Sequence, residues 1–399
     1  MDEPQKLLSR DFILLFLLGT CSNCYLAIFY CLEQWLASQG VDASTSGVLI
    51  AALPFMVLFT RPVASWALLG RDKMPAMVVS IGISSLVMLT YPFVQGPHVV
   101  ALVFCLRVVQ GIALAVYSSC TVAVLVSCIP PGQSARGFAL FSLTLLLPFS
   151  IIPAVAEQLL AIVGSETRLF AWSALLGLPA LAMLLPLASR LRAEQVPGNA
   201  VSGVSRAQLW HSVRHSGLFF VFLACMLFSI MTNQAIIFMK GLCSVTGGQA
   251  GVFFTIYTCT IMLLRLACSR HLDKLQRYPA IWFSSLVLGV SMAGIGFGPA
   301  WGLAPFSCMY GLALGLLYPL LAAVVYDRSL PETRSLNSNV MMATFDASGV
   351  IGPILGGMVV QFGMGYRGVF ATNAAAVLLC GLCMVLDWLR VQTPPQSKA

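Results

Sequence analysis

The chain has 399 residues, of which 59% are apolar and only 9% are charged. This composition excludes a soluble globular domain, because such domains carry about 25% charged residues. The formal net charge of +8 fits basic loops that meet anionic lipid headgroups better than it fits a nucleic-acid surface.

Apolar stretches long enough to cross a bilayer recur along the whole chain. A helix needs about 20 mostly apolar residues to cross a hydrocarbon core of about 30 Å, and open sheets leave backbone groups unpaired in lipid. We therefore predict an all-α membrane protein with twelve transmembrane helices. The predicted spans are 12–37, 45–69, 75–94, 98–122, 137–163, 168–189, 216–240, 248–268, 278–297, 300–325, 337–362 and 367–389.

The start of the chain and its basic residues predict the orientation. The first span ends in polar Glu33 and Gln34 without a small-residue cleavage site, so we expect a retained helix and not a removed signal peptide. Most of the 22 Lys and Arg residues fall on loops that are cytoplasmic if the N-terminus is inside. The sequence therefore predicts a multi-pass protein of a bacterial-type inner (plasma) membrane with both termini in the cytoplasm.

A single long polar stretch divides the predicted helices into two groups of six. It covers residues 190–215 and is interrupted by Pro197 and Gly203. This predicts an N-terminal six-helix bundle over 1–189, a cytoplasmic linker, and a C-terminal six-helix bundle over 216–399.

Residues of the same type recur in the two halves at a nearly constant offset. Such internal repeats are typical of transporters that hold substrate near the bilayer midplane. The matching pairs are Gly111 with Gly311, Pro131 with Pro331, Pro153 with Pro353, and Arg61 with Arg265.

Several motifs resemble those of the major facilitator superfamily. The stretch CLRVVQGIALAVYSS matches the family's Arg-x-x-Gln-Gly pattern through Arg107, Gln110 and Gly111. FTRPVASWALLGRDKM resembles its cytoplasmic loop signature without the Asp, whereas the second-half counterpart LLRLACSRHLDKL keeps an acidic-basic pair. The resemblance covers nearly the whole chain and implies two six-helix bundles related by a pseudo-twofold axis. It also implies a cytoplasmic gate, for which the candidates are Arg61, Arg265, Asp273 and Lys274.

The eleventh span resembles exporters within this superfamily. TFDASGVIGPILGG keeps an Asp-x-x-Gly-x-x-Gly-Pro arrangement from Asp346 to Pro353. The fifth span keeps Pro148 and Pro153 but lacks the Gly of the drug-antiporter signature. The stretches FFTIYTCTIMLLRL and LFSLTLLLPFSIIP are similar to exporters of nicotianamine-like metallophores such as staphylopine.

Ionisable residues inside the spans are the first functional candidates, because each costs about 2.5–3.5 kcal/mol at a helix centre. Arg107 lies near mid-depth, where it either binds an anion or couples to protons, or forms a permanent ion pair or helix-capping contact. Asp346 lies at a similar depth, where a buried carboxyl can carry a proton; its alternative role is a hydrogen bond to the Gly-rich helix. Glu33 and Glu157 occupy outer span ends and are either proton or cation sites or solvated end residues.

Uncharged polar and aromatic side chains complete the candidate site. Amides on the first span of each half bind a polar substrate, or else form hydrogen bonds between helices. Tyrosines contribute aromatic surface and shape. The substrate-binding candidates are Asn23, Arg107, Gln110, Asn233, Gln234, Tyr30 and Tyr257.

Motifs of other chemistry do not occur in this sequence. It has no phosphate-binding Gly-rich loop with Lys and Ser or Thr, no H-E-x-x-H and no ATPase domain. Nearly all of its 13 cysteines fall inside spans, where thiols pack as small apolar groups. We therefore expect no cofactor, no metal site and no enzymatic activity.

These features predict a proton-coupled exporter, that is, an antiporter, of a small organic molecule such as a metallophore, drug or metabolite, working by alternating access. The first alternative is a proton symporter that imports an organic anion. The second is a receptor or lipid scramblase on the same fold. The expected partners are the substrate, protons and the lipid bilayer, with no nucleic acid, and the expected assembly is a monomer.

Overall fold

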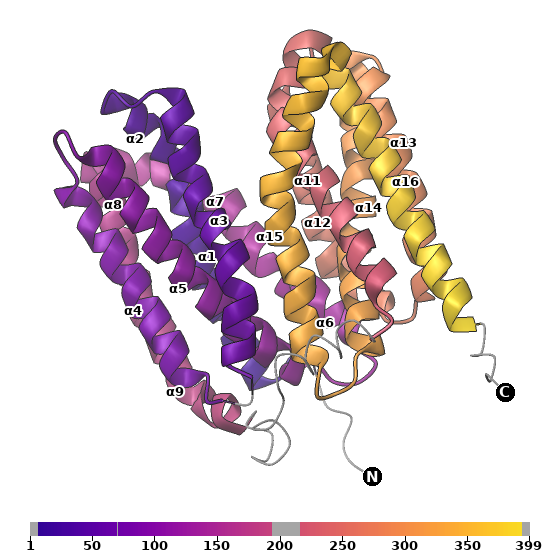
Figure 1. The fold of residues 1–399 in the computed structure, drawn as a ribbon, viewed down its shortest axis with the longest axis horizontal. Helices are drawn as coiled ribbons and strands as arrows, with labels where there is room; N and C mark the ends of the chain where they lie inside the picture. The colour runs from indigo at the N-terminus through magenta and orange to yellow at the C-terminus, as the bar shows by residue number, and fades with distance from the viewer. Residues whose placement is uncertain (1–6, 70, 194–215, 393–399) are drawn as a thin grey trace. The chain divides into compact units, whose positions relative to one another are not determined.

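All regular secondary structure in the described part of the chain is helical. The computed structural model describes residues 7–69, 71–193 and 216–392, and the regular elements in these ranges are helices (Figure 1). The chain divides into two compact units: an N-terminal unit of Met1–Pro130 and Phe141–Val204, and a C-terminal unit of Pro131–Leu140 and Ser205–Ala399.

Residues 131–140 pack with the C-terminal unit, although the sequence assigns them to the first half. Most of the predicted linker 190–215 lies outside the described residues.

The N-terminal unit begins its helices at polar caps. The Ser9 side chain accepts a hydrogen bond from the Phe12 backbone N–H at 3.3 Å, and Asp42 accepts one from Thr45 at 2.9 Å, so each satisfies a backbone donor that a helix start leaves open. The elements of this unit are α1 (Arg10–Ala27), η1 (Ile28–Cys31), α2 (Leu32–Ser38), α3 (Ala43–Ala67), α4 (Met74–Thr90), η2 (Tyr91–Phe93), α5 (Val99–Cys128), α7 (Leu143–Val163), α8 (Glu166–Ser173), η3 (Ala174–Leu176) and α9 (Gly177–Ala193).

The C-terminal unit repeats this succession of long helices. Gly247 ends its first long helix with a left-handed φ of 76°, just as Gly164 ends α7 at 81°, because glycine adopts this conformation without a steric penalty. The elements are α6 (Ser134–Phe141), α11 (Phe219–Thr246), α12 (Ala250–Leu272), α13 (Arg277–Phe297), η4 (Ala300–Gly302), α14 (Leu303–Arg328), α15 (Arg334–Val359), η5 (Val360–Met364) and α16 (Gly365–Gln392).

The twelve predicted spans all correspond to helical segments of the structure. Nine stretches of the described chain are long and apolar enough to cross a membrane, and the last, Arg334–Gln392, carries the eleventh and twelfth spans on either side of a kink at Gly363. The first span is interrupted by the 3-10 turn η1, and the fifth is divided into α6 and α7. Helix α5 continues from its predicted end at 122 to Cys128 because the next helix-breaking residue is Pro130.

Helices pack in the same order inside each unit. In the N-terminal unit α1 packs on α7 and α9, α3 on α5, and α4 on α5 and α9. In the C-terminal unit α11 packs on α15 and α16, α12 on α14, and α13 on α14 and α16. The internal packing of the two units therefore agrees with the duplication that the sequence indicates.

The paired glycines of the two units lie at close approaches between helix backbones. A Cβ atom on Gly111 of α5 would lie 2.7 Å from the Leu53 carbonyl oxygen and 2.8 Å from Met56 Cβ on α3. A Cβ atom on Gly311 of α14 would lie 2.8 Å from the Tyr257 carbonyl oxygen on α12. Only a residue without a side chain permits this backbone approach, which is how small residues hold membrane helices together.

Many large apolar side chains are exposed along the spanning helices. Phe93 and Trp301 are each 81% exposed, and Phe362 is 80% exposed. Such an extent of apolar surface is expected of helices that face lipid, whereas proteins in water rarely expose large apolar patches.

Replacing Gly111 with alanine is predicted to lower the stability of the N-terminal unit. The added methyl group must push α5 away from α3, which costs about 1–3 kcal/mol for overpacking of this kind. The midpoint of thermal unfolding of the purified protein in detergent should fall accordingly.

The matched control is Gly82→Ala on α4, where an added Cβ meets nothing within 4 Å. Its midpoint should stay the same or rise, because alanine favours a helix over glycine by up to about 1 kcal/mol. Equal midpoints for the two variants would contradict the close contact of α3 and α5.

Candidate functional site

The buried Arg107 is the most distinctive charged group of the N-terminal unit. It lies in the first third of α5, is 5% exposed, and donates a hydrogen bond from Nη1 to Gln110 Oε1 at 3.2 Å. The two residues are three positions apart and therefore share one face of the helix. Since a guanidinium can only donate hydrogen bonds, the amide oxygen of Gln110 must face it.

Aromatic rings surround the rest of the guanidinium. Its carbon lies 4.7 Å from the centre of the Phe29 ring, and the charge interacts with the Tyr91 phenol. Phe29 and Tyr91 also pack on Phe170, with ring centres 4.8 Å and 5.2 Å away. Electron-rich ring faces stabilise a cation that has left water.

Among the side chains that the structure describes, no carboxylate forms an ion pair with Arg107. The Gln110 oxygen and the rings provide its polar and π contacts, so a positive charge lies in the apolar bundle without a described negative partner. The Arg107 guanidinium can therefore bind an anion through its charge and its N–H donors.

The predicted amide candidates on the first long helix of each unit, α1 and α11, contact a neighbouring helix. Asn23 of α1 donates from Nδ2 to Thr144 Oγ1 of α7 at 3.4 Å. Gln234 of α11 donates from Nε2 to the Gly352 carbonyl of α15 at 2.9 Å. The same kind of contact thus links α1 to α7 and α11 to α15, which are corresponding helix pairs.

Asn233 belongs to a small polar cluster between α11 and α15. Its Nδ2 donates to Ser348 Oγ at 2.8 Å and to the Ser229 carbonyl at 3.0 Å, and the Ser229 and Ser348 hydroxyls bond to each other. The sequence leaves two roles open for Asn233: hydrogen bonds between helices and substrate binding. The structure contains the first, and the half-buried position of Asn233 is compatible with both.

Asp346 lies on α15 two residues before Ser348 and is half-buried. Residues two apart point about 200° away from each other on a helix. Because Ser348 faces α11, Asp346 points to the other side of α15. The C-terminal unit thus carries a titratable group within a spanning helix, next to but not inside the amide cluster.

Tyr257 belongs to an aromatic cluster of the C-terminal unit. Its ring centre lies 4.9 Å from Phe253 and 5.4 Å from Tyr310, so α12 and α14 meet through rings near the Gly311 contact. The side chains of the other predicted candidates, Tyr30, Glu33 and Glu157, lie outside the described part of the structure, and their roles stay predictions.

The two predicted gate arginines occupy corresponding positions on α3 and α12. Arg61 and Arg265 are 7% and 4% exposed. The Arg61 carbonyl accepts a hydrogen bond at 2.7 Å from Ser65, whose hydroxyl also reaches Ser119 of α5 at 3.3 Å. The Arg265 guanidinium lies 5.4 Å from the ring centre of Tyr318 on α14.

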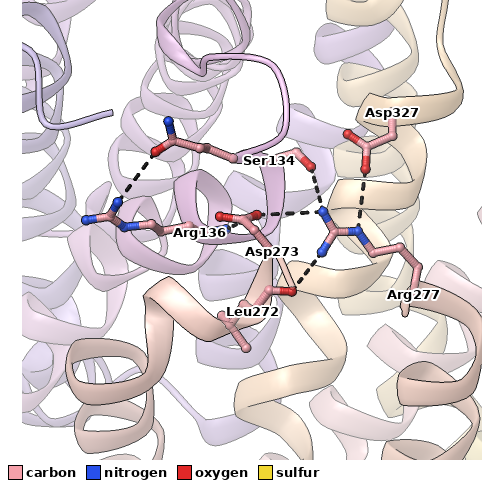
Figure 2. A network of polar contacts seen from close by, with 7 residues as sticks. Ser134, Arg136, Leu272, Asp273, Arg277 and Asp327 are labelled. Carbon is pink, nitrogen blue, oxygen red and sulfur yellow. Dashed lines mark hydrogen bonds and ion pairs between the residues drawn. The ribbon is translucent and has the colours of Figure 1, made fainter. Parts of the chain in front are cut away.

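Asp273 forms the centre of a polar network at the end of α12 (Figure 2). Its Oδ1 accepts a hydrogen bond from the Arg136 backbone N–H at 3.2 Å and lies 3.6 Å from Arg277 Nη2. Arg277 also pairs with Asp327 Oδ2 at 3.5 Å and donates to Ser134 Oγ at 3.3 Å. The carboxylate thereby satisfies the open N–H end of α6, where a negative charge is favourable.

Burial raises the pKa of the Asp273 carboxyl above its usual value of 3.8, although the Arg136 N–H and Arg277 act in the opposite direction. The free-energy cost of removing the carboxylate charge from water is therefore larger than the stabilisation of that charge by these contacts. Lys274, the predicted basic partner, is exposed; the described ion pair of Asp273 is made with Arg277.

Sequence reasoning missed a second buried ion pair in the C-terminal unit. Arg328 of α14 pairs with Asp387 of α16, which is 1% exposed and also accepts a hydrogen bond from Tyr278 at 2.9 Å. The sequence contains the signal for this pair, because Asp387 is an acidic residue inside the apolar span 367–389. The rule that selects Asp346 also selects Asp387.

One family model matches nearly the whole chain. The model of the Major Facilitator Superfamily matches residues 12–243 and 218–399. An efflux pump of Aspergillus niger, azaK, is 27% identical over 122 residues, which cover 30% of this chain and 26% of that protein. The match thus spans about a quarter of the relative's length.

Solved structures with this fold cover nearly the whole chain. A bacterial homologue of the iron transporter ferroportin has a TM-score of 0.75 at 13% identity, covering 96% of this chain and 100% of that one. The human organic anion transporter MFSD10 has a TM-score of 0.72 at 16% identity, with the same coverage. The Escherichia coli fucose:proton symporter has a TM-score of 0.72 at 14% identity, covering 94% and 98%. At these identities the likeness shows the fold alone.

The raised pKa of Asp273 predicts that Asp273→Asn keeps or raises the thermal midpoint at neutral pH, because asparagine keeps an acceptor for the Arg136 N–H without the buried charge. Since the folded pKa lies above the unfolded one, wild type gains stability on acidification and loses it as the pH rises through the raised pKa. The advantage of Asp273→Asn over wild type should therefore shrink as the pH is lowered.

Asp273→Ala removes the acceptor and should cost about 1 kcal/mol, while the exposed control Lys274→Ala should leave the midpoint unchanged. The measurement is thermal unfolding of each variant between acidic and neutral pH. If Asp273→Asn were as unstable as Asp273→Ala at neutral pH, burial of the Asp273 charge would not cost more than its contacts contribute, and the prediction would be wrong.

Proposed function

Because the chain belongs to the major facilitator superfamily, whose members are transporters and not enzymes, we propose that it is a proton-coupled exporter of a small organic molecule. Export would proceed by alternating access, with a proton entering as substrate leaves. The substrate would be a metallophore, drug or metabolite, and the protein would act as a monomer in a bacterial-type inner membrane with both termini in the cytoplasm.

The position of Asp346 carries this proposal. Coupling requires a group inside the spanning region that can exist with and without a proton. Asp346 lies within α15, half-buried, and is separated by helix geometry from the Asn233 and Ser348 cluster. Its carboxyl would bind a proton in one state and release it in the other, while the amides would position polar groups of the substrate.

The direction of transport rests on resemblance. The eleventh-span Asp-x-x-Gly-x-x-Gly-Pro arrangement is similar to that of exporters, and the Aspergillus niger relative, which is matched over 26% of its length, is named an efflux pump. The staphylopine-like stretches extend the proposal to metallophores as one substrate class.

Import of an organic anion by proton symport is the second candidate, and the environment of Arg107 favours it. A buried guanidinium held by rings and one amide oxygen, without a described carboxylate partner, is suited to a substrate carboxylate. MFSD10, one of the proteins with the same fold, is an organic anion transporter.

The proposal predicts that Asp346→Asn abolishes transport driven by a pH gradient but keeps exchange of substrate across the membrane. Asparagine imitates the protonated carboxyl and cannot release a proton. Compounds that accumulate in the medium of overproducing cells, identified by mass spectrometry, supply the substrate for proteoliposomes. Gradient-driven flux and counterflow are then measured for each variant.

Glu332→Gln is the matched control, since Glu332 is an exposed carboxylate just before α15. It should behave as wild type in both assays. Full gradient-driven flux in Asp346→Asn would refute the coupling role. Accumulation inside the cells instead of the medium would refute export and favour the symporter. No flux of any compound would favour a receptor or scramblase.

A further inference from the structure

The N-terminal unit contains a small polar pocket among α1, α4 and α5. Its volume corresponds to about one water molecule. Six of its lining side chains are polar, and none is acidic. They are Ser22 and Tyr25 from α1, Ser80 and Ser84 from α4, and Gln110 and Tyr117 from α5.

Gln110 lines this pocket with its side-chain amide close to Arg107. Arg107 holds the amide oxygen at 3.2 Å, and a guanidinium cannot accept a hydrogen bond, so the amide orientation is fixed by chemistry. The two N–H donors of Nε2 then lie on the side of the amide away from that contact, and Gln110 lines the pocket.

Two hydroxyls add donors from the other helices. Ser22 is 7% exposed and lies beside Tyr117, yet its Oγ makes no hydrogen bond of normal geometry with the described residues. The Tyr117 hydroxyl is directed to the Leu18 carbonyl at 3.3 Å. Ser84 also lines the pocket. Each of the three helices thus supplies one group that can donate into the same small space.

The charge of Arg107 favours an anion over water in this space. The guanidinium lies one helical turn from the pocket-lining amide, within an apolar bundle, and has no described carboxylate partner. Burying a charge is costly, and an opposite charge nearby recovers part of that cost. We infer that the pocket binds a small monovalent anion of the size of chloride, held by Gln110, Ser22 and Ser84 and neutralising Arg107. This inference is independent of the proposed proton-coupled export, which rests on Asp346, but it competes with the use of Arg107 to bind a substrate carboxylate.

The experiment measures thermal unfolding of the full chain in detergent as sodium chloride replaces sodium gluconate at constant ionic strength. The wild-type midpoint should rise with chloride and saturate. Ser22→Ala should raise the half-saturating chloride concentration about tenfold, as for loss of a hydrogen bond to a charged group. Ser118→Ala is the control, because Ser118 lies on α5 outside the pocket and donates to its own helix carbonyl at 3.2 Å.

Gln110→Glu provides a second test that does not depend on a loss of folding. Its carboxylate would pair with Arg107 and replace the anion, so the midpoint in gluconate should rise and the chloride response should vanish. Crystals grown in bromide should show an anomalous peak in the pocket of wild type and none in Gln110→Glu.

A wild-type midpoint that does not change with chloride would overturn the inference. So would a half-saturating chloride concentration that is unchanged in Ser22→Ala, or a chloride response that persists in Gln110→Glu. So would a pocket that holds only water in bromide crystals. Formate serves as the third arm: a shift with formate but not with chloride would overturn the halide assignment in favour of a carboxylate group.

Discussion

Lipid leaves no partner for a backbone N–H or C=O, so each spanning segment must satisfy these groups within its own helix. Once this is done, the helices can be held together only by side-chain packing and by a few polar contacts. The structure shows both means in corresponding places. Gly111 lets α5 approach α3, and Gly311 lets α14 approach α12. Asn23 reaches α7, and Asn233 and Gln234 reach α15.

The same constraint explains why charge is concentrated in a few positions. Asp387 is buried but paired with Arg328 and Tyr278, and Asp273 is placed at the open N–H end of α6. Truncating one member of such a pair leaves the other charge unsatisfied, which is why buried pairs resist substitution whatever their net contribution. Arg107 differs, because rings and an amide oxygen take the place of a described carboxylate.

The sequence was sufficient for the fold because hydrophobic length and glycine spacing are local signals. Twelve spans, two repeats and the Gly111 and Gly311 pair all follow from it, and the helix pairing within each unit supports the duplication. Spacing shows which face of a helix a residue occupies, but not which helix lies opposite that face. For this reason the sequence does not pair Asp387 with Arg328 or Asp273 with Arg277, and it does not show that residues 131–140 pack with the C-terminal unit.

The two units have kept the same packing and diverged in their polar groups. At the offset that relates Gly111 to Gly311, Arg107 and Gln110 correspond to Ser307 and Tyr310. The Ser307 hydroxyl bonds to its own helix at Leu303, and Tyr310 packs on the rings of Phe253 and Tyr257. The positive charge and its donor-lined pocket therefore belong to the N-terminal unit, while the titratable Asp346 belongs to the C-terminal unit. A permanently charged guanidinium cannot exchange protons at physiological pH. An anion would therefore neutralise Arg107 in the N-terminal unit, and a proton would neutralise Asp346 in the C-terminal unit.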